Sequence, residues 1–262
     1  MFQTQGSGSF TAHQDLIRGN TAINDHESLI DFPSRGPWGC DAGPHAHTSL
    51  LTDKELYRFN KGPAPCLGYA TIRDLLDAKG VTWKYDVAPL ERGSSGYIWN
   101  AFDAIRVVRY GNGGSEWTNN VIMPETGVFK QISSGQLANV TWVIPAAQNS
   151  DHPYATDHGP QWVAQVVNAI GKSQYWNSTA IVVTWDDWGG WYDHVLPPGW
   201  TRWATGLRLA RTAVVGFTVG KTRIRFPHRP RGHWVHHLYR TQLQPWFTGP
   251  ARRERGRLRG LL

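Results

Sequence analysis

Three short segments of the chain have the residue pattern of β-strands. Val81, Trp83 and Tyr85 alternate with polar residues, as expected when one face of a strand is buried. A second strand is predicted over residues 139–144 (NVTWVI). Residues 180–185 (AIVVTW) form an apolar run rich in β-branched residues, so we expect a strand that is buried on both faces.

Two helices are predicted beside these strands. Thr71 can cap a helix that runs to Lys79, because Gly80 suits the position after its end. The expected apolar face of this helix consists of Ile72, Leu75 and Leu76. A longer helix is expected to open at Gly159 and Pro160 and to close at Gly171. Its broad apolar face has five members: Trp162, Val163, Val166, Val167 and Ile170.

The order of these elements indicates an α/β fold. A strand, a helix and a strand in succession form a βαβ unit, which predicts a mostly parallel sheet flanked by helices. Residues 1–70 and 87–135 lack these periods, and we expect them to form loops around the sheet.

Composition supports a folded core and excludes two classes of protein. The 262 residues include 14 Trp, 9 Tyr and 9 Phe, which is too aromatic for a chain that is mostly disordered. No segment approaches the roughly 18 consecutive apolar residues of a membrane-spanning helix, so no transmembrane segment is expected. The amino terminus lacks the basic and apolar regions of a secretory signal, so the chain as written is expected to be cytoplasmic.

The net charge of +7 is distributed unevenly along the chain. Residues 1–200 carry 13 basic and 19 acidic side chains, a net charge of −6. Residues 201–262 carry 14 basic side chains against Glu254 alone, a net charge of +13. The two parts therefore differ in chemistry as well as in composition.

The basic segment has two interpretations. In the first, the chain is a non-catalytic binding protein whose basic tail contacts nucleic acid or an anionic membrane, with aromatic side chains stacking on bases. In the second, residues 199–262 are an out-of-frame translation, because GC-rich DNA read off frame yields Arg, Pro, Gly and Trp. The segment shows no RNA- or DNA-binding motif, so we expect no specific nucleic-acid partner.

An acidic pair directly follows the third predicted strand. Asp186 and Asp187 stand at its carboxyl end, where parallel sheets bind ligands, and Asp193 and His194 follow closely. Adjacent carboxylates repel each other unless a cation or a hydrogen-bond network compensates, and a divalent metal ion is a common solution. The alternative is an ordinary Asx turn that leads into a loop. The position after a buried strand favours the metal site.

Two further clusters contain candidate catalytic residues. His152 follows the strand that ends at Ile144, where an imidazole could bind phosphate or act as a general acid, although by itself it is better explained as a hydrogen-bonded loop histidine. Residues 6–10 (GSGSF) read by themselves as a flexible segment, followed by His13. His45 and His47 have the spacing of metal ligands, but their Pro- and Gly-rich setting indicates a loop and they are not assigned to a site.

The two cysteines, Cys40 and Cys66, are too few for a four-ligand zinc site. They are either independent buried thiols or a disulfide, which would stabilise the fold by about 3 to 4 kcal/mol in the chain-entropy model. A disulfide would require an oxidising compartment. The residues alone leave both possibilities open.

Taken in order, these clusters resemble the bacterial phosphoesterase family of phospholipases C and acid phosphatases, within the alkaline phosphatase superfamily. The most specific matching segment is STAIVVTWDDWGGWYDHVLPP. The others are MFQTQGSGSFTAHQDLIRG, WGCDAG, PCLGYATIRDLLDAKGVTWKYD, GYIWNAFDAI and NSDHP. Together they cover nearly all of residues 1–198.

The resemblance implies a role for each candidate residue. Ser9 aligns with the family's hydroxyl nucleophile, and Ser7 is the rival two residues away. Asp186 and Asp187 align with a metal-binding pair, to which Ser9 adds its oxygen. His152 aligns with a histidine near the substrate phosphate, and His194 with the histidine of a YDH motif. Cys40 and Cys66 align with similar cysteines, which favours the disulfide and a secreted or periplasmic parent protein.

The resemblance also implies an activity and a domain division. The expected activity is metal-dependent hydrolysis of a phosphate ester or phospholipid, with a divalent ion as cofactor. Residues 1–198 are expected to form a partial domain with an alkaline phosphatase-like core, because a family strand and a Glu-Asn metal motif would precede Met1. Such a fragment could be inactive. Residues 199–262 are expected to be a basic segment outside the family pattern.

Overall fold

The computed structural model describes residues 7–152 and 158–186. Its central element is strand β4 (Trp83–Asp86), which lies between β5 (Val121–Ile122) and β6 (Val140–Val143) and is parallel to both. Tyr85 is in register with Val121 on one side and Trp142 on the other. The strands predicted around Trp83 and over residues 139–144 are therefore confirmed.

The main hydrophobic core packs on β4. Trp83 and Tyr85 are almost fully buried, and both rings contact Phe102, at centroid distances of 4.9 and 5.1 Å. Leu76 and Val108, from flanking helices, belong to the same buried cluster. The alternation therefore predicted the buried face of this strand correctly, and on that face the rings of Trp83 and Tyr85 pack against Phe102.

Residues 27–58 form a second sheet. Its strands β1 (Glu27–Ile30), β2 (Ser49–Thr52) and β3 (Tyr57–Arg58) are antiparallel to one another. Leu29 and Leu50 pack with Phe10 in a separate buried cluster. The expectation that residues 1–70 form only loops was wrong, because strands of two to four residues are too short for their alternation to stand out.

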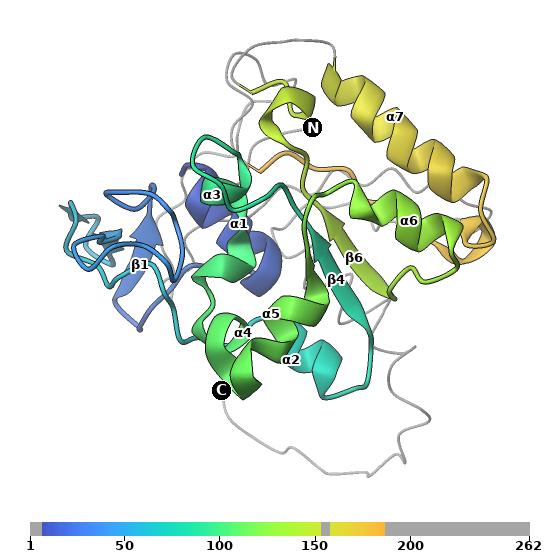
Figure 1. Ribbon diagram of the computed structural model, residues 1–262. Helices are drawn as coiled ribbons and strands as arrows, with labels where there is room; N and C mark the ends of the chain where they lie inside the picture. Colours follow the sequence, from blue (N-terminus) through green and yellow to red (C-terminus); the bar gives the residue numbers. More distant parts are fainter. Residues whose placement is uncertain (1–6, 153–157, 187–262) are drawn as a thin grey trace, which may run out of the picture.

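Helices flank the parallel sheet, and Figure 1 shows α6 and α7 on the side of β6 that lies away from the antiparallel sheet. The α-helices have the following bounds: α1 Ser9–Arg18, α2 Ile72–Asp77, α3 Gly96–Trp99, α4 Arg106–Tyr110, α5 Ser115–Asn120, α6 Gly127–Ser133 and α7 His158–Gly171. Short 3-10 turns are η1 Ala101–Ala104, η2 Gly111–Gly114, η3 Ala147–Asn149 and η4 Trp176–Ser178. Residues 87–135 are thus largely helical rather than loops, in helices too short to show a clear period.

The two predicted helices are α2 and α7. In α7, Trp162 and Ile170 are buried on the predicted face. In α2, Leu76 is buried as expected, whereas Leu75 is 47% exposed. Arg73 is buried instead, so the apolar face assigned to α2 was partly wrong.

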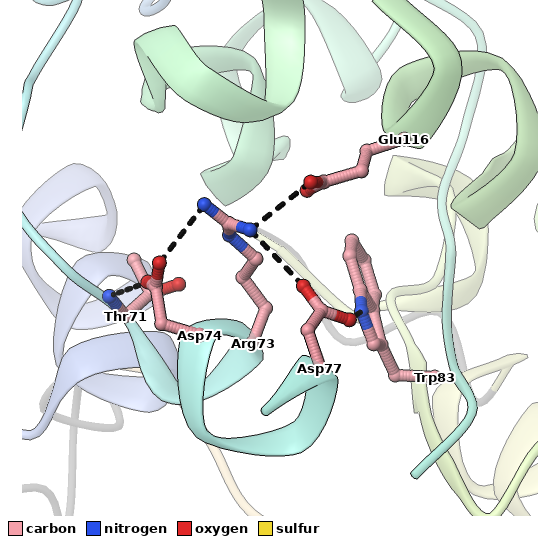
Figure 2. A network of polar contacts seen from close by, with 6 residues as sticks. All are labelled: Thr71, Arg73, Asp74, Asp77, Trp83 and Glu116. Carbon is pink, nitrogen blue, oxygen red and sulfur yellow. Dashed lines mark hydrogen bonds and ion pairs between the residues drawn. The ribbon is translucent and has the colours of Figure 1, made fainter. Parts of the chain in front are cut away.

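Arg73 is buried because three carboxylates surround it, as Figure 2 shows. Its guanidinium lies 2.9 Å from Asp74 and 3.0 Å from both Asp77 and Glu116. Asp77 also accepts a hydrogen bond of 2.8 Å from the Trp83 indole. This network joins α2 to α5 and to the first residue of β4, which is the amino end of the parallel sheet.

Cys40 and Cys66 form a disulfide, with Cα atoms 4.3 Å apart. The backbone around it is also held to η1, since Cys40 N donates to the Asp103 carbonyl oxygen at 2.8 Å. The pairing that the family resemblance favours is confirmed.

The strand predicted over residues 180–185 was wrong. Within the described part of the chain this segment pairs with no strand, and Val182 and Trp185 are about half exposed. Ile181 packs beside the cluster of Val128, Ile132 and Ile170. A β-branched run becomes a strand only where a neighbour pairs with its backbone N–H and C=O groups.

The chain is an α/β protein with one parallel and one antiparallel sheet. An alkaline phosphatase-like core stays a prediction, as does the domain boundary after residue 198, since residues 187–262 lie outside the described part. Across residues 7–152 and 158–186, none of the helices is both long and apolar enough to cross a bilayer.

Candidate active site

The candidate nucleophile Ser9 is the first residue of α1. Gly8 caps this helix with an extended backbone, and its carbonyl oxygen accepts hydrogen bonds from Ala12 N at 3.2 Å and Thr11 Oγ1 at 2.9 Å. The segment GSGSF is therefore a helix start, and the prediction that it is flexible by itself does not describe residues 7–10. The backbone N–H groups of the first turn of a helix favour a negatively charged ligand.

His13 connects this helix start to Asp186. Its Nδ1 lies 2.8 Å from the carbonyl oxygen of Ser9 and 3.3 Å from Oδ2 of Asp186. Because a carbonyl oxygen only accepts hydrogen bonds, Nδ1 carries the hydrogen and donates it. The imidazole is almost fully buried, with 7% of its side chain exposed, whereas Asp186 is 31% exposed. Two candidate residues from opposite ends of the described chain thus meet around one histidine.

Strand β4 contributes Tyr85, whose buried hydroxyl joins α3 to η1. The Tyr85 hydroxyl donates to the Trp99 carbonyl oxygen and accepts from Ala101 N, both at 3.3 Å. Complete burial raises the pKa of Tyr85, and the negative charge of Asp186 raises it further. Tyr85 therefore stays a neutral donor close to the carboxylate.

His152 reaches the same region through Trp99. Its imidazole packs edge-on against the Trp99 ring, at a centroid distance of 5.6 Å. Its backbone N–H donates to Ser150 Oγ at 3.2 Å, and its side chain is exposed. His152 thus packs on α3, and α3 also contacts α1.

The rival nucleophile Ser7 has a different environment from Ser9. Ser7 is 8% exposed, and its Oγ accepts a hydrogen bond of 2.5 Å from the backbone N–H of Asp31. Ser9 is only half-buried. The hydroxyl of Ser7 thus fastens the loop after β1 to the start of α1.

A buried carboxyl group lies beneath the candidate site. Asp15, in α1, is 3% exposed, and neither of its carboxylate oxygens has a hydrogen-bond partner in the described residues. Burial raises its pKa well above the usual range, although Arg18 opposes the shift. Burial thus favours the neutral form of this carboxyl group in α1.

The described residues do not complete a metal site by themselves. Within residues 7–152 and 158–186, no three His, Cys, Asp or Glu side chains are grouped so as to hold a metal ion. Asp186 is the one proposed carboxylate ligand inside this part, and the predicted sites Asp187 and His194 lie outside it. The metal assignment therefore stays a prediction.

Sequence reasoning did not assign His13 to the site. Its position four residues after Ser9 was the available signal, because side chains at i and i+4 share a face of a helix. That signal depends on α1 being a helix, which the Gly-Ser composition of residues 6–9 obscured.

Comparison with known proteins finds one family and several relatives. The model of the Phosphoesterase family matches residues 2–229. The non-hemolytic phospholipase C of Burkholderia pseudomallei is 26% identical over 163 residues, which is 50% of this chain and 22% of that protein. The non-hemolytic phospholipase C of Pseudomonas aeruginosa is 28% identical over 141 residues, 50% of this chain and 19% of that protein.

A plant protein matches a shorter segment. The non-specific phospholipase C6 of Arabidopsis thaliana is 35% identical over 77 residues, 26% of this chain and 15% of that protein. The chain thus spans about a fifth of the length of the curated relatives that it matches. Because the family model covers most of its residues, the chain belongs to the phosphoesterase family.

Proposed function

We propose that the protein hydrolyses phosphate esters with Ser9 as nucleophile. The observation that carries this proposal is the position of His13, whose Nδ1 holds both the Ser9 carbonyl oxygen and Asp186. This contact ties an acidic side chain to the first turn of α1, the helix that begins with Ser9 and whose N-terminus favours phosphate oxygens. The names of the relatives support the same chemistry, since they are phospholipases C.

The reaction takes place in two displacements. Ser9 Oγ attacks phosphorus and loses its proton, and the ester oxygen leaves with its bond to phosphorus broken and gains a proton. Water then attacks the phosphoserine, which restores the serine hydroxyl and releases phosphate or a phosphomonoester. The backbone N–H groups of the first turn of α1 stabilise the phosphoryl oxygens during both steps.

The remaining candidates have supporting roles in this proposal. His13 is a positioning residue, because it holds Asp186 beside the first turn of α1. His152 approaches the leaving group as a general acid, and His194 contributes from the segment after Asp187. We assign Asp186, Asp187 and Ser9 as ligands of a divalent cation. When bound, such a cation favours the deprotonated serine and neutralises charge on the phosphoryl group.

The proposed substrates are phosphate esters that include phospholipids. The sequence similarity to two phospholipases C supports a lipid ester as substrate. The disulfide favours an oxidising compartment, such as the periplasm or the cell exterior.

The test is hydrolysis of two soluble esters, p-nitrophenyl phosphate and p-nitrophenyl phosphorylcholine, before and after treatment with a chelator. We expect turnover that the chelator removes and that added divalent metal restores. Ser9→Ala is expected to lower kcat by about a thousandfold or more, as loss of a nucleophile does. Ser7→Ala is the matched control, and it should change kcat by less than about tenfold because Ser7 Oγ serves a backbone contact.

The outcomes separate the parts of the proposal. Equal activity of Ser9→Ala and the parent protein would exclude Ser9 as nucleophile, and loss of activity in Ser7→Ala alone would transfer the role to Ser7. Full activity in the presence of chelator would exclude the metal. A folded protein that hydrolyses neither ester would contradict the proposed activity of this chain.

A further inference from the structure

Trp99 is a buried side chain that contacts a candidate catalytic residue. It is the last residue of α3 and is 7% exposed. Its ring packs against the imidazole of His152, at a centroid distance of 5.6 Å and an interplanar angle of 68°. Aromatic rings prefer such near-perpendicular contacts. Since His152 itself is exposed, contact with a buried ring limits the rotamers that its imidazole can take.

Trp99 is itself held by the parallel sheet. Its carbonyl oxygen accepts a hydrogen bond of 3.3 Å from the hydroxyl of Tyr85 in β4, and its ring belongs to the same buried cluster as Tyr85 and Phe102. Gly96 begins α3 so close to the chain after β4 that a Cβ atom there would lie 1.9 Å from the Ala88 carbonyl oxygen. The indole is therefore a rigid support for a side chain that packs on it.

The backbone that carries His152 is connected to the same helix. Ser95, the N-cap of α3, is 6% exposed, and its Oγ accepts a hydrogen bond of 3.1 Å from Ala147 N in η3. Ser150 Oγ donates to the Ala147 carbonyl oxygen at 2.8 Å and accepts from His152 N at 3.2 Å. Hydrogen bonds thus run from the start of α3 to the backbone of His152, and the ring contact with Trp99 leads from its side chain back to the end of α3.

The residue before His152 is held by another helix. Asp151 has a left-handed backbone, with a φ of 57°, and its Oδ1 accepts a hydrogen bond of 3.2 Å from the backbone N–H of Gly159. Gly159 is the second residue of α7, where backbone N–H groups have no partner within the helix. The backbone that leads into His152 is therefore fixed. The direction of the imidazole then depends on its side-chain torsions, which the contact with Trp99 restricts.

Helix α3 also contacts α1, the helix that begins with the candidate nucleophile Ser9. One short helix thus packs against both elements that carry proposed catalytic side chains. A general acid acts only when it lies within hydrogen-bond distance of the oxygen that it protonates. Its orientation therefore affects the rate as directly as its chemistry does.

We propose that Trp99 is a positioning residue, which holds the imidazole of His152 in the orientation that protonates the leaving oxygen of the ester. This role rests on the phosphoesterase function proposed above. The proton passes from the imidazolium to the ester oxygen as that oxygen takes the electron pair of the breaking bond to phosphorus. Without the indole the imidazole samples other rotamers, and the fraction of molecules with a correctly oriented acid falls by about three- to tenfold.

The test is hydrolysis of two esters that share a phosphoryl group and differ in leaving group. Phenolate, from phenyl phosphate, is a strong base that needs a proton as it leaves, whereas p-nitrophenolate, from p-nitrophenyl phosphate, is a weak base. Trp99→Leu should lower kcat for phenyl phosphate by about three- to tenfold more than kcat for p-nitrophenyl phosphate, with KM little changed. Trp99→Phe keeps a ring beside His152 and should bring the ratio of the two kcat values back to that of the parent protein.

Trp162→Leu is the matched control. Trp162, in α7, is 6% exposed and packs edge-on against Phe129 at a centroid distance of 5.4 Å, so this variant loses a buried indole whose ring contact is not with His152. It should leave the ratio of the two kcat values unchanged. In a His152→Ala background, Trp99→Leu should not change this ratio further, because the two residues act as one unit.

A second measurement does not require activity. The imidazole proton NMR signals of His152, identified by their loss in His152→Ala, should move in Trp99→Leu because the ring current of the indole no longer acts on them. Three results would overturn the proposal: signals that stay in place, a kcat ratio that Trp99→Leu changes no more than Trp162→Leu does, or a ratio that Trp99→Leu still changes without His152. A parent protein that hydrolyses neither ester, but whose His152 signals move, would uphold the positioning of the imidazole and contradict the proposed activity.

Discussion

The carboxyl group of Asp86 provides a direct test of the electrostatics of the parallel sheet. Asp86 ends β4 and is fully buried, and its Oδ1 accepts a hydrogen bond of 2.6 Å from Gln131 Nε2. Its Oδ2 is also buried, without a partner in the described residues. Burial raises the pKa of Asp86 to about 7, although Gln131 and Lys84 oppose the shift. We predict that Asp86→Asn changes stability in opposite directions at low and high pH.

The direction in which stability changes with pH follows from the number of protons that the folded and unfolded states bind. An unfolded Asp titrates near its usual value of 3.8, whereas the folded Asp86 keeps its proton up to about pH 7. Between these values the folded state binds more protons, so wild-type stability is highest at low pH and falls as the pH rises towards 7. At about 1.4 kcal/mol per pH unit, the loss between about pH 5 and pH 8.5 is about 3 kcal/mol.

Asp86→Asn removes this dependence and keeps the acceptor for Gln131. The new amide places unsatisfied donors where Oδ2 was, at a cost of about 1–3 kcal/mol at every pH. The variant should therefore be less stable than wild type at about pH 5 and equal or more stable at about pH 8.5. Asp15 and Asp103 also have raised pKa values, but their effects cancel in the comparison of the two proteins.

The assay is urea unfolding of both proteins across this pH range, with the exposed Asp25→Asn as the control for loss of one charge. The quantity of interest is the difference in unfolding free energy between variant and wild type at each pH. A difference that stays constant from about pH 5 to about pH 8.5 would refute the raised pKa of Asp86. The same trend in Asp25→Asn would show that net charge, and not burial, is responsible.

Two further predictions concern the links that join the elements. Replacing both Cys40 and Cys66 by Ser should lower the free energy of unfolding by about 3–4 kcal/mol, because the bond closes a loop across a sequence separation of 26; thermal melting that is equal for variant and parent would contradict this. Arg73→Met should cost about 1–3 kcal/mol in urea unfolding, because it leaves three neighbouring, partly exposed carboxylates without the buried cation that pairs with them. Arg58→Met is its control and should cost at most about 1 kcal/mol, because the ion pair with Glu27 is exposed; equal losses in the two variants would refute the importance of burial.

Elements with a long or regular pattern were predictable from the sequence. Trp83 and Tyr85 alternate with polar residues, and α7 repeats its apolar positions over 14 residues, so both were recognised. Residues 180–185 have an equally apolar pattern, but no neighbouring strand pairs with them in the described part of the chain. Strand formation there depends on a partner, which the local sequence does not contain.

The candidate site, too, was only partly predictable from the sequence. The motifs around Ser9, His152 and Asp186 were identifiable from residue type and order, and the family match agrees with the resemblance that they carry. The role of His13 could not be read in this way. Its contact with Asp186 joins α1 to a segment at the far end of the described chain, and it depends on how the two pack.

The sequence by itself determined the chemistry available to this protein: a serine in a Gly-Ser segment, an acidic pair, two cysteines that can be bonded, and enough aromatic residues for a core. Tertiary structure decided which of these groups meet. It placed His13 between Ser9 and Asp186, buried Arg73 among carboxylates, and left Leu56 and Phe59 exposed on a projecting hairpin. The physical reason is that burial and pairing depend on contacts between distant segments, whereas periodicity reports only how each segment would present its own faces.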